Sequence, residues 1–359
     1  MAPSADFWSG KRVLLTGHSG FKGGWLALWL ARLGAQVTGL SLPPATSPNL
    51  FEAAGIAENL GSHFGDIRDA GLVADLVRTS RPQIVLHLAA QPLVRASYRA
   101  PLDTFASNVM GTAHLLDALR GQQDVRVAVI VTTDKVYQNH EWLWPYRETD
   151  ALGGHDPYSA SKAAAEIVTA SYRKSFLDAQ GTAVATARAG NVIGGGDWSE
   201  DRLIPDAIRA WSAGRPLSIR HPDSIRPWQH VLEPLAGYLL LAEKLWEAPA
   251  LADAFNFGPP PADTATVRDV IDLARAVYGK GETQYGREEN TQLHEAGYLS
   301  LENSKAHRLL GIQPRWSLPE AVRRTIDWYR RLAEGQDARH LCASDLDAYT
   351  QDAKRTQDV

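Results

Sequence analysis

The segment Lys11-Arg-Val-Leu-Leu-Thr-Gly-His-Ser-Gly-Phe-Lys-Gly-Gly-Trp25 decides the fold. Residues 11–16 predict a short buried strand, and the apolar run 25–33 is typical of a helix. The Gly-x-x-Gly-x-x-Gly turn between them lets Gly17 turn tightly, Gly20 approach a pyrophosphate, and Gly23 pack the helix on the strand. Because the start of a helix attracts phosphates, the segment predicts the first βαβ unit of a dinucleotide-binding fold.

The same alternation of strand and helix continues along the chain. Apolar strands are predicted at residues 36–40, 84–88, 127–131 and 183–188, with strongly helical patterns between and after them. This order predicts an α/β fold with a Rossmann-like, doubly wound parallel sheet and a smaller, interleaved C-terminal substrate lobe. We expect residues 1–187 to form the cofactor domain, residues 188–335 the substrate lobe and residues 336–359 a peripheral tail.

The cofactor contacts are expected at the carboxyl ends of the predicted strands. The second strand ends at Ser41 without the acid that often holds an adenosine ribose, and the lack of a basic cluster favours NAD over NADP. Asp66 is a candidate for the adenine edge, with helix capping as the alternative. The candidate cofactor residues are Gly17, Gly20, Phe21, Gly23, Asp66, Ile67, Leu88, Ala89, Ala90, Tyr158 and Lys162.

Composition excludes several classes of function. The chain has 359 residues, is 44% apolar and 22% charged, and carries a formal net charge of -4. We therefore expect no nucleic-acid partner and no membrane partner. The single Cys342 excludes an intramolecular disulfide, and His221 and His230 lack further ligands at metal spacing, so no metal is expected. No signal-peptide pattern opens the sequence, so we expect a cytoplasmic protein.

A second informative stretch runs from Thr133 to Lys162. Tyr158 and Lys162 are four residues apart, so they share one face of a predicted helix. A lysine beneath the phenol is expected to lower the tyrosine pKa from about 10 toward neutrality. Asp134 and Lys135, just after the strand 127–131, add two proton-handling groups of opposite charge. The set indicates chemistry beyond a simple oxidation.

Together these motifs resemble the extended short-chain dehydrogenase/reductases that act on nucleotide sugars. The stretches Arg188-Ala-Gly-Asn-Val-Ile-Gly-Gly-Gly-Asp-Trp198 and Arg226-Pro-Trp-Gln-His-Val231 fit the same family. The triplet Thr133-Asp134-Lys135 is similar to that of the 4,6-dehydratases acting on CDP-glucose, whereas those acting on dTDP-glucose carry Thr-Asp-Glu. The resemblance covers about residues 8 to 330.

The resemblance implies a redox-neutral dehydration of CDP-D-glucose to CDP-4-dehydro-6-deoxy-D-glucose with bound NAD, for deoxysugar and lipopolysaccharide O-antigen biosynthesis. Tyr158, held by Lys162, would take the proton of the 4-hydroxyl, and Thr133 would bond near that oxygen. Asp134 would protonate the leaving 6-hydroxyl. Lys135 would remove the proton at position 5, or else act only as a positive support for substrate oxygens.

The family also implies substrate contacts and an assembly. The substrate-binding candidates are Asn191, Arg202, Arg226 and Trp228, and the helices at 101–120 and 157–176 would pair subunits into a homodimer or homotetramer. The alternatives are a dTDP- or GDP-sugar dehydratase, a 4-epimerase, or a catalytically silent NAD-binding scaffold. An epimerase needs no acid at position 6, so Asp134 beside Lys135 argues against it.

Overall fold

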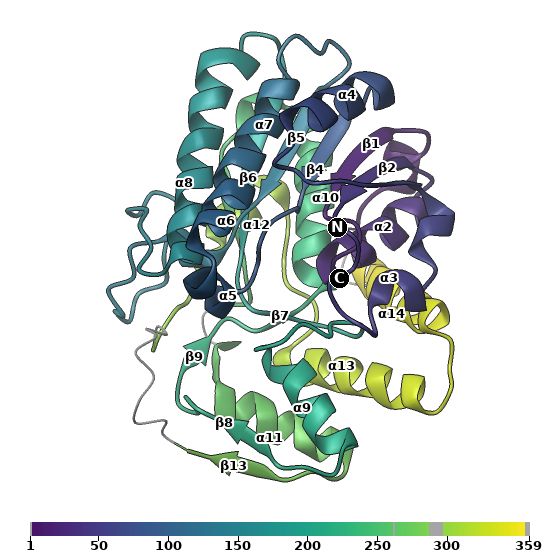
Figure 1. Cartoon of the computed structure of the whole chain (residues 1–359), viewed down its shortest axis with the longest axis vertical. Coiled ribbons are helices and arrows are strands. Elements are labelled where there is room, and N and C mark those ends of the chain that lie inside the picture. Colours follow the sequence, from purple (N-terminus) through teal and green to yellow (C-terminus); the bar gives the residue numbers. More distant parts are fainter. Residues whose placement is uncertain (1, 261–262, 287–296, 356–359) are drawn as a thin grey trace.

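A seven-stranded parallel sheet forms the centre of the protein, in the strand order β11-β6-β5-β4-β1-β2-β3 (Figure 1). The computed structural model describes residues 2–260, 263–286 and 297–355. The strands are β1 (Arg12–Thr16), β2 (Gln36–Ser41), β3 (Gly61–Phe64), β4 (Ile84–His87), β5 (Val127–Val131), β6 (Ala183–Ala189) and β11 (Ala254–Phe257). The predicted Rossmann-like sheet is confirmed, and its strand order reverses between β1 and β4, where such sheets bind ligands.

Helices cover both faces of this sheet. Because side chains alternate along a strand, Leu15 joins the core under α2 (Phe21–Arg32) and α10 (Leu232–Glu247), while Leu14 joins a second core. That second core lies under α4 (Ala70–Ser80), α7 (Gly111–Ala118) and α8 (Pro157–Tyr172). Burial on both faces explains why these strands are almost continuously apolar.

Two long helices contain π-helical turns that the sequence pattern did not indicate. The predicted helix at 101–120 consists of α6 (Pro101–Phe105), a π turn η2 (Ala106–Met110) and α7. Asn108, in this π turn, bonds both the backbone of Gln91 and the hydroxyl of Ser161 on α8. A second π turn, η4 (Arg173–Leu177), follows α8 directly. The π turn at Asn108 thus ties α8 to the loop after β4.

The second lobe lies at one end of the sheet (Figure 1). It contains α9 (Leu203–Ser212), β8 (Leu217–Ile219), β9 (Ile225–Arg226), β12 (Ala265–Thr266), α11 (Val267–Tyr278), β13 (Thr283–Tyr285) and α13 (Leu318–Ala333). The chain crosses between lobes more than once, since α10 and β11 pack on and in the main sheet. The domain boundaries at residues 187 and 335 stay predictions.

Shorter elements complete the described fold. They are α1 (Ala5–Trp8), α3 (Leu50–Ala53), η1 (Ile56–Asn59), α5 (Val94–Arg99), η3 (Asp134–Val136), β7 (Val192–Ile193), β10 (Gln229–His230), η5 (Pro249–Leu251) and α12 (Ser304–Leu310). In the part of the chain that the structure describes, no helix is both long enough and apolar enough to cross a membrane.

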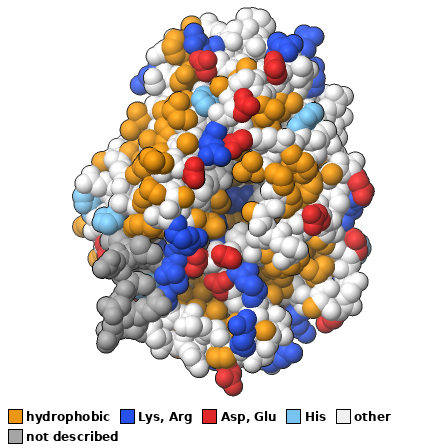
Figure 2. Space-filling model, in the orientation of Figure 1, with side chains coloured by type: hydrophobic (Ala, Val, Ile, Leu, Met, Phe, Trp, Pro, Cys, Tyr) orange, Lys and Arg blue, Asp and Glu red, His pale blue; other side chains and the backbone are white. Residues whose placement is uncertain are grey.

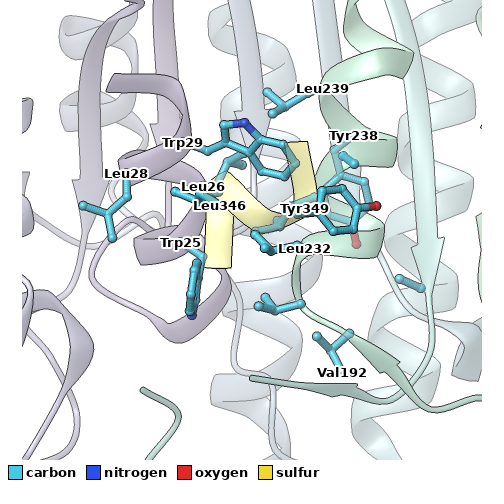
Figure 3. Close-up of a cluster of buried hydrophobic side chains, with 14 of the residues drawn as sticks. Trp25, Leu26, Leu28, Trp29, Val192, Leu232, Tyr238, Leu239, Leu346 and Tyr349 are labelled. Carbon is cyan, nitrogen blue, oxygen red and sulfur yellow. The ribbon is translucent and has the colours of Figure 1, made fainter. Parts of the chain in front are cut away.

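The segment expected to be a peripheral tail forms α14 (Ala338–Arg355) and contributes to the main core. Tyr349 packs edge-on against Trp29 of α2, with ring centroids 5.7 Å apart (Figure 3). Its hydroxyl donates a 2.8 Å hydrogen bond to buried Glu233 on α10. Arg339 donates to the carbonyl of Ala54, at the end of α3. The last described helix therefore closes the first lobe.

Candidate active site

A cavity of about 1090 Å³ lies at the carboxyl ends of the sheet strands, between the sheet and the second lobe. Figure 2 shows its mouth as a hollow near the middle of the face, bordered by charged side chains. The structure brings every sequence-predicted site residue to this cavity: Gly17, Gly20, Phe21, Gly23, Asp66, Ile67, Leu88, Ala89, Ala90, Thr133, Asp134, Lys135, Tyr158, Lys162, Asn191, Arg202, Arg226 and Trp228.

The glycine turn forms a close-fitting cradle on one wall. Gly17 has a φ of +81°, and a Cβ on it would lie 2.8 Å from the backbone nitrogen of Ala89. A Cβ on Gly23 would lie 2.0 Å from the carbonyl oxygen of Gly17. Because α2 starts at this turn, the first amides of the helix have no helical partner. The cradle, which a side chain at either glycine would fill, fits the pyrophosphate of a dinucleotide.

The adenosine side of the cavity has its own polar pairs. The hydroxyl of Ser41, at the end of β2, lies 2.6 Å from that of Ser19. Asp66 forms an ion pair with Arg68 at 2.6 Å, and the hydrogen bond from Arg68 lowers the pKa of this carboxyl. Asp66 is therefore held ionised at the cavity wall, and its contact with an adenine edge stays a prediction.

The Thr-Asp-Lys triplet follows β5. Thr133 caps the short helix η3, and Asp134 and Lys135 are its first two residues. Thr133 donates a 3.0 Å hydrogen bond to Oδ1 of Asp134, and the Lys135 ammonium lies 3.6 Å from the same oxygen. Asp134 is completely buried, and its Oδ2 has no hydrogen-bond partner among the described residues. A buried polar atom without a partner is costly, so this oxygen is placed for a ligand.

Tyr158 and Lys162 lie side by side on the first turns of α8, which Asp156 caps, but the expected effect on the phenol is not found. Burial raises the pKa of Tyr158 to about 12, although a hydrogen bond with Thr133 works in the opposite direction. Lys162 donates a 3.1 Å bond to the carbonyl of Val131, and burial lowers its own pKa to about 8. Desolvation of the phenol therefore outweighs the hydrogen bond with Thr133 and the nearby charge of Arg202.

The second lobe contributes the four predicted substrate residues. The carbonyl of Asn191, just after β6, accepts the backbone amide of Gln229, which places the glycine-rich loop beside β10. Arg202 is the N-cap residue of α9, and Arg226 ends β9 with its guanidinium bonded to the carbonyl of Ile225. Trp228 is buried at the cavity wall. These positions surround the catalytic groups from the opposite side.

Two further features of the cavity were not predicted. Asp201, a non-glycine residue with a φ of +57°, lies 3.7 Å from Arg95 of α5 and 3.8 Å from Arg220, which follows β8. This bridge joins the two lobes over the cavity.

Lys22, inside the glycine turn, also lines the cavity. The only signal for Lys22 was a charge within an otherwise apolar helix start. Among the described residues, no cluster of His, Cys, Asp or Glu suits a metal ion.

This combination of fold and site defines a class of nucleotide-sugar-modifying short-chain enzymes. A model of the GDP-mannose 4,6 dehydratase family matches residues 14–325, so the chain belongs to that family. The predicted membership among nucleotide-sugar dehydratases of the extended short-chain dehydrogenase/reductase family is thereby confirmed.

Individual relatives are consistent with this membership. The chain is 46% identical to CDP-glucose 4,6-dehydratase of Salmonella typhimurium, over 92% of this chain and 94% of that protein. It is 27% identical to a dTDP-glucose 4,6-dehydratase of Xanthomonas campestris, over 88% and 92% of the two chains. A dTDP-glucose 4,6-dehydratase double mutant from Streptomyces venezuelae, solved with NAD bound, superposes with a TM-score of 0.76 at 25% identity, covering 89% and 97% of the two chains.

Proposed function

We propose that this protein is an NAD-dependent CDP-glucose 4,6-dehydratase, which converts CDP-D-glucose to CDP-4-dehydro-6-deoxy-D-glucose. The observation that carries the proposal is the placement of Asp134, Lys135, Tyr158 and Lys162 in one cavity, in a chain 46% identical to a CDP-glucose 4,6-dehydratase. Asp134 is a buried carboxyl with one oxygen available, as elimination of a hydroxyl requires. This acid favours a dehydratase over a 4-epimerase or a silent scaffold.

The glycine cradle would hold the cofactor pyrophosphate, with Leu88, Ala89 and Ala90 beside it at the end of the neighbouring strand. NAD held there would supply the hydride acceptor for position 4 of the sugar and the hydride donor for position 6, so the overall reaction would be redox-neutral. Tyr158 takes the proton of the 4-hydroxyl, and Thr133 orients that oxygen. Lys162 stays fixed by the carbonyl of Val131 beneath them.

The elimination of water uses the other pair of side chains. With a ketone at position 4, the proton at position 5 becomes acidic. Lys135, left as a neutral amine once its ammonium has passed a proton to Asp134, takes that proton as the C–H bond breaks. Asp134 gives its proton to the 6-hydroxyl, which leaves as water while the double bond forms. Both groups come from η3, 3.6 Å apart, so they address neighbouring carbons of one sugar.

We also propose that two copies of the chain pair through α6, α7 and α8. These helices lie together along one side of the molecule (Figure 1). They and the adjoining π turns carry large apolar side chains that the single chain leaves exposed: Leu102, Phe105, Met110, Ile167 and Phe176. Apolar surface of this kind is typical of a subunit interface.

A cytoplasmic location and a role in deoxysugar or O-antigen biosynthesis belong to the proposal that the protein is a CDP-glucose 4,6-dehydratase.

The deciding experiment is a parallel assay of CDP-glucose, dTDP-glucose, UDP-glucose and GDP-mannose with NAD supplied, scoring the 4-keto-6-deoxy product. We expect product from CDP-glucose. Product from another nucleotide sugar alone would keep the reaction and reject the substrate. No product from any of them would reject the dehydratase and favour the epimerase or the silent scaffold.

A further inference from the structure

Lys22 occupies an unusual position for a charged residue. It lies in the first turn of α2, one residue before Gly23, within the turn that fits a dinucleotide pyrophosphate. Its side chain lines the cavity, and its charge interacts with Asp134, Lys162 and Arg202. The side chain therefore reaches from the cofactor wall toward the catalytic groups and the second lobe.

Most of the cationic side chains that line the cavity have a partner among the described residues. Lys135 faces Asp134, Lys162 bonds the carbonyl of Val131, and Arg95 and Arg220 share Asp201. The exceptions are two cations from opposite lobes.

Lys22 and Arg202 are those exceptions. Neither forms an ion pair or a side-chain hydrogen bond with any described residue, and each repels the other across the cavity. Two unpaired cations that face each other over an open cavity form a site for an anion.

We propose that Lys22 and Arg202 bind the diphosphate of the nucleotide sugar between them, so that Lys22 is a substrate-binding residue within the dinucleotide turn. This inference rests on the proposed function for the identity of the anion. The dinucleotide pyrophosphate belongs at the free amides of α2, which leaves the lysine side chain for a second diphosphate. Arg202 belongs to the lobe that carries the other predicted substrate residues.

The surroundings of Lys22 couple binding of the diphosphate to protonation of this lysine. Its pKa is lowered to about 7, mainly by burial and next by the charge of Arg202; Lys162 and Lys135 add to this lowering, and Asp134 opposes it. An anion between Lys22 and Arg202 raises the pKa again. At pH 8 the free cavity therefore holds a largely neutral Lys22, and binding of a diphosphate takes up a proton.

The test measures binding of CDP, cytidine and NAD by calorimetry at pH 8, in two buffers of different ionisation enthalpy. Lys22→Met is expected to weaken CDP binding about 10- to 100-fold, with little change for cytidine or NAD. The wild type should take up a proton with CDP, and Lys22→Met should not. Lys22→Arg should keep most of the affinity without the proton uptake, because arginine stays charged. Lys280→Met, an exposed lysine that follows α11 outside the cavity and the proposed subunit interface, is the matched control.

Unchanged CDP affinity in Lys22→Met would overturn the proposal. A loss confined to NAD would assign the lysine to the dinucleotide and overturn it equally. If the wild type binds dTDP or UDP in place of CDP, the proposed substrate fails, and the same comparison with that diphosphate still decides the role of Lys22.

Discussion

Tyr158 combines a high pKa with a catalytic position, so its hydroxyl is the most direct target for mutation. We expect Tyr158→Phe to lower kcat at least about 100-fold, because general acid–base groups contribute about 10²- to 10⁴-fold. Thermal melting should stay close to the wild type. Tyr172→Phe, at the end of the same helix, is the matched control and should retain activity. Near-normal turnover by Tyr158→Phe would move the base to another residue.

His87 makes stability depend on pH. Its ring bonds Thr16 at 2.7 Å and Thr112 at 3.1 Å, and burial lowers its pKa to about 3. The unfolded chain takes up this proton below about pH 6.5, so the free energy of unfolding falls as the pH drops. The slope is about 1.36 kcal/mol per pH unit, or about 2 kcal/mol between pH 7 and pH 5.

In His87→Gln we expect this pH-dependent loss to shrink by about 2 kcal/mol, although the variant is less stable at pH 7. Urea unfolding at pH 7 and pH 5 measures both quantities. An equal loss in the variant and the wild type would show that His87 does not titrate in this way.

At the residue scale, local motifs predicted which side chains would gather in the cavity. The glycine turn, the Thr133 triplet and the Tyr158–Lys162 spacing each carry their geometry within a few residues. The Arg95–Asp201–Arg220 bridge was missed because its members come from separate parts of the chain. The predicted lowering of the Tyr158 pKa was wrong for a related reason. Burial raises this pKa, and burial depends on the whole fold and not on the neighbouring lysine.

Between elements, the main polar connection is the buried ion pair of Glu166 on α8 and Arg188 on β6. Arg188 donates to both carboxylate oxygens, at 3.0 and 2.8 Å, and both side chains are almost fully buried. Thr132 and Thr186 donate to the same carboxylate. The pair therefore fixes the helix that carries Tyr158 to two strands of the sheet.

We expect Arg188→Met to reduce the free energy of unfolding by about 3–5 kcal/mol, because it leaves the Glu166 carboxylate buried without its cation. Adding Glu166→Gln should restore part of this loss, since the buried charge is removed. Denaturant unfolding of the two single variants and the double variant gives the coupling. A cost below about 1 kcal/mol for Arg188→Met would contradict the prediction.

Element positions were largely predictable, and the exceptions have physical causes. Hydrophobic patterns placed β1, β2, β4, β5 and β6 to within about a residue or two, because strands buried on both faces leave a strong apolar signal. The π turns at 106–110 and 173–177 were not predicted, since they insert one residue without changing composition. The helix α14 was underestimated because its weak amphipathic pattern gains its partners only from distant residues.

On the scale of the whole molecule, the exposed apolar side chains of α6 and α8 predict an assembly. We expect the double variant Leu102→Asp, Ile167→Asp to run as a single chain in light scattering, whereas the wild type forms at least a dimer. Leu309→Asp, an exposed leucine on α12, which packs against β11 and α10, is the matched control. An unchanged mass for the double variant would place the interface on another surface.

The position of α14 affects how the protein is synthesised. Tyr349 is translated 320 residues after Trp29 (349 − 29), yet it completes the cover over that side chain. We therefore expect the first lobe to keep apolar surface exposed until α14 has left the ribosome, and transiently exposed apolar surface is what chaperones protect. A message truncated before residue 338 would encode every active-site residue and still yield a lobe that cannot close.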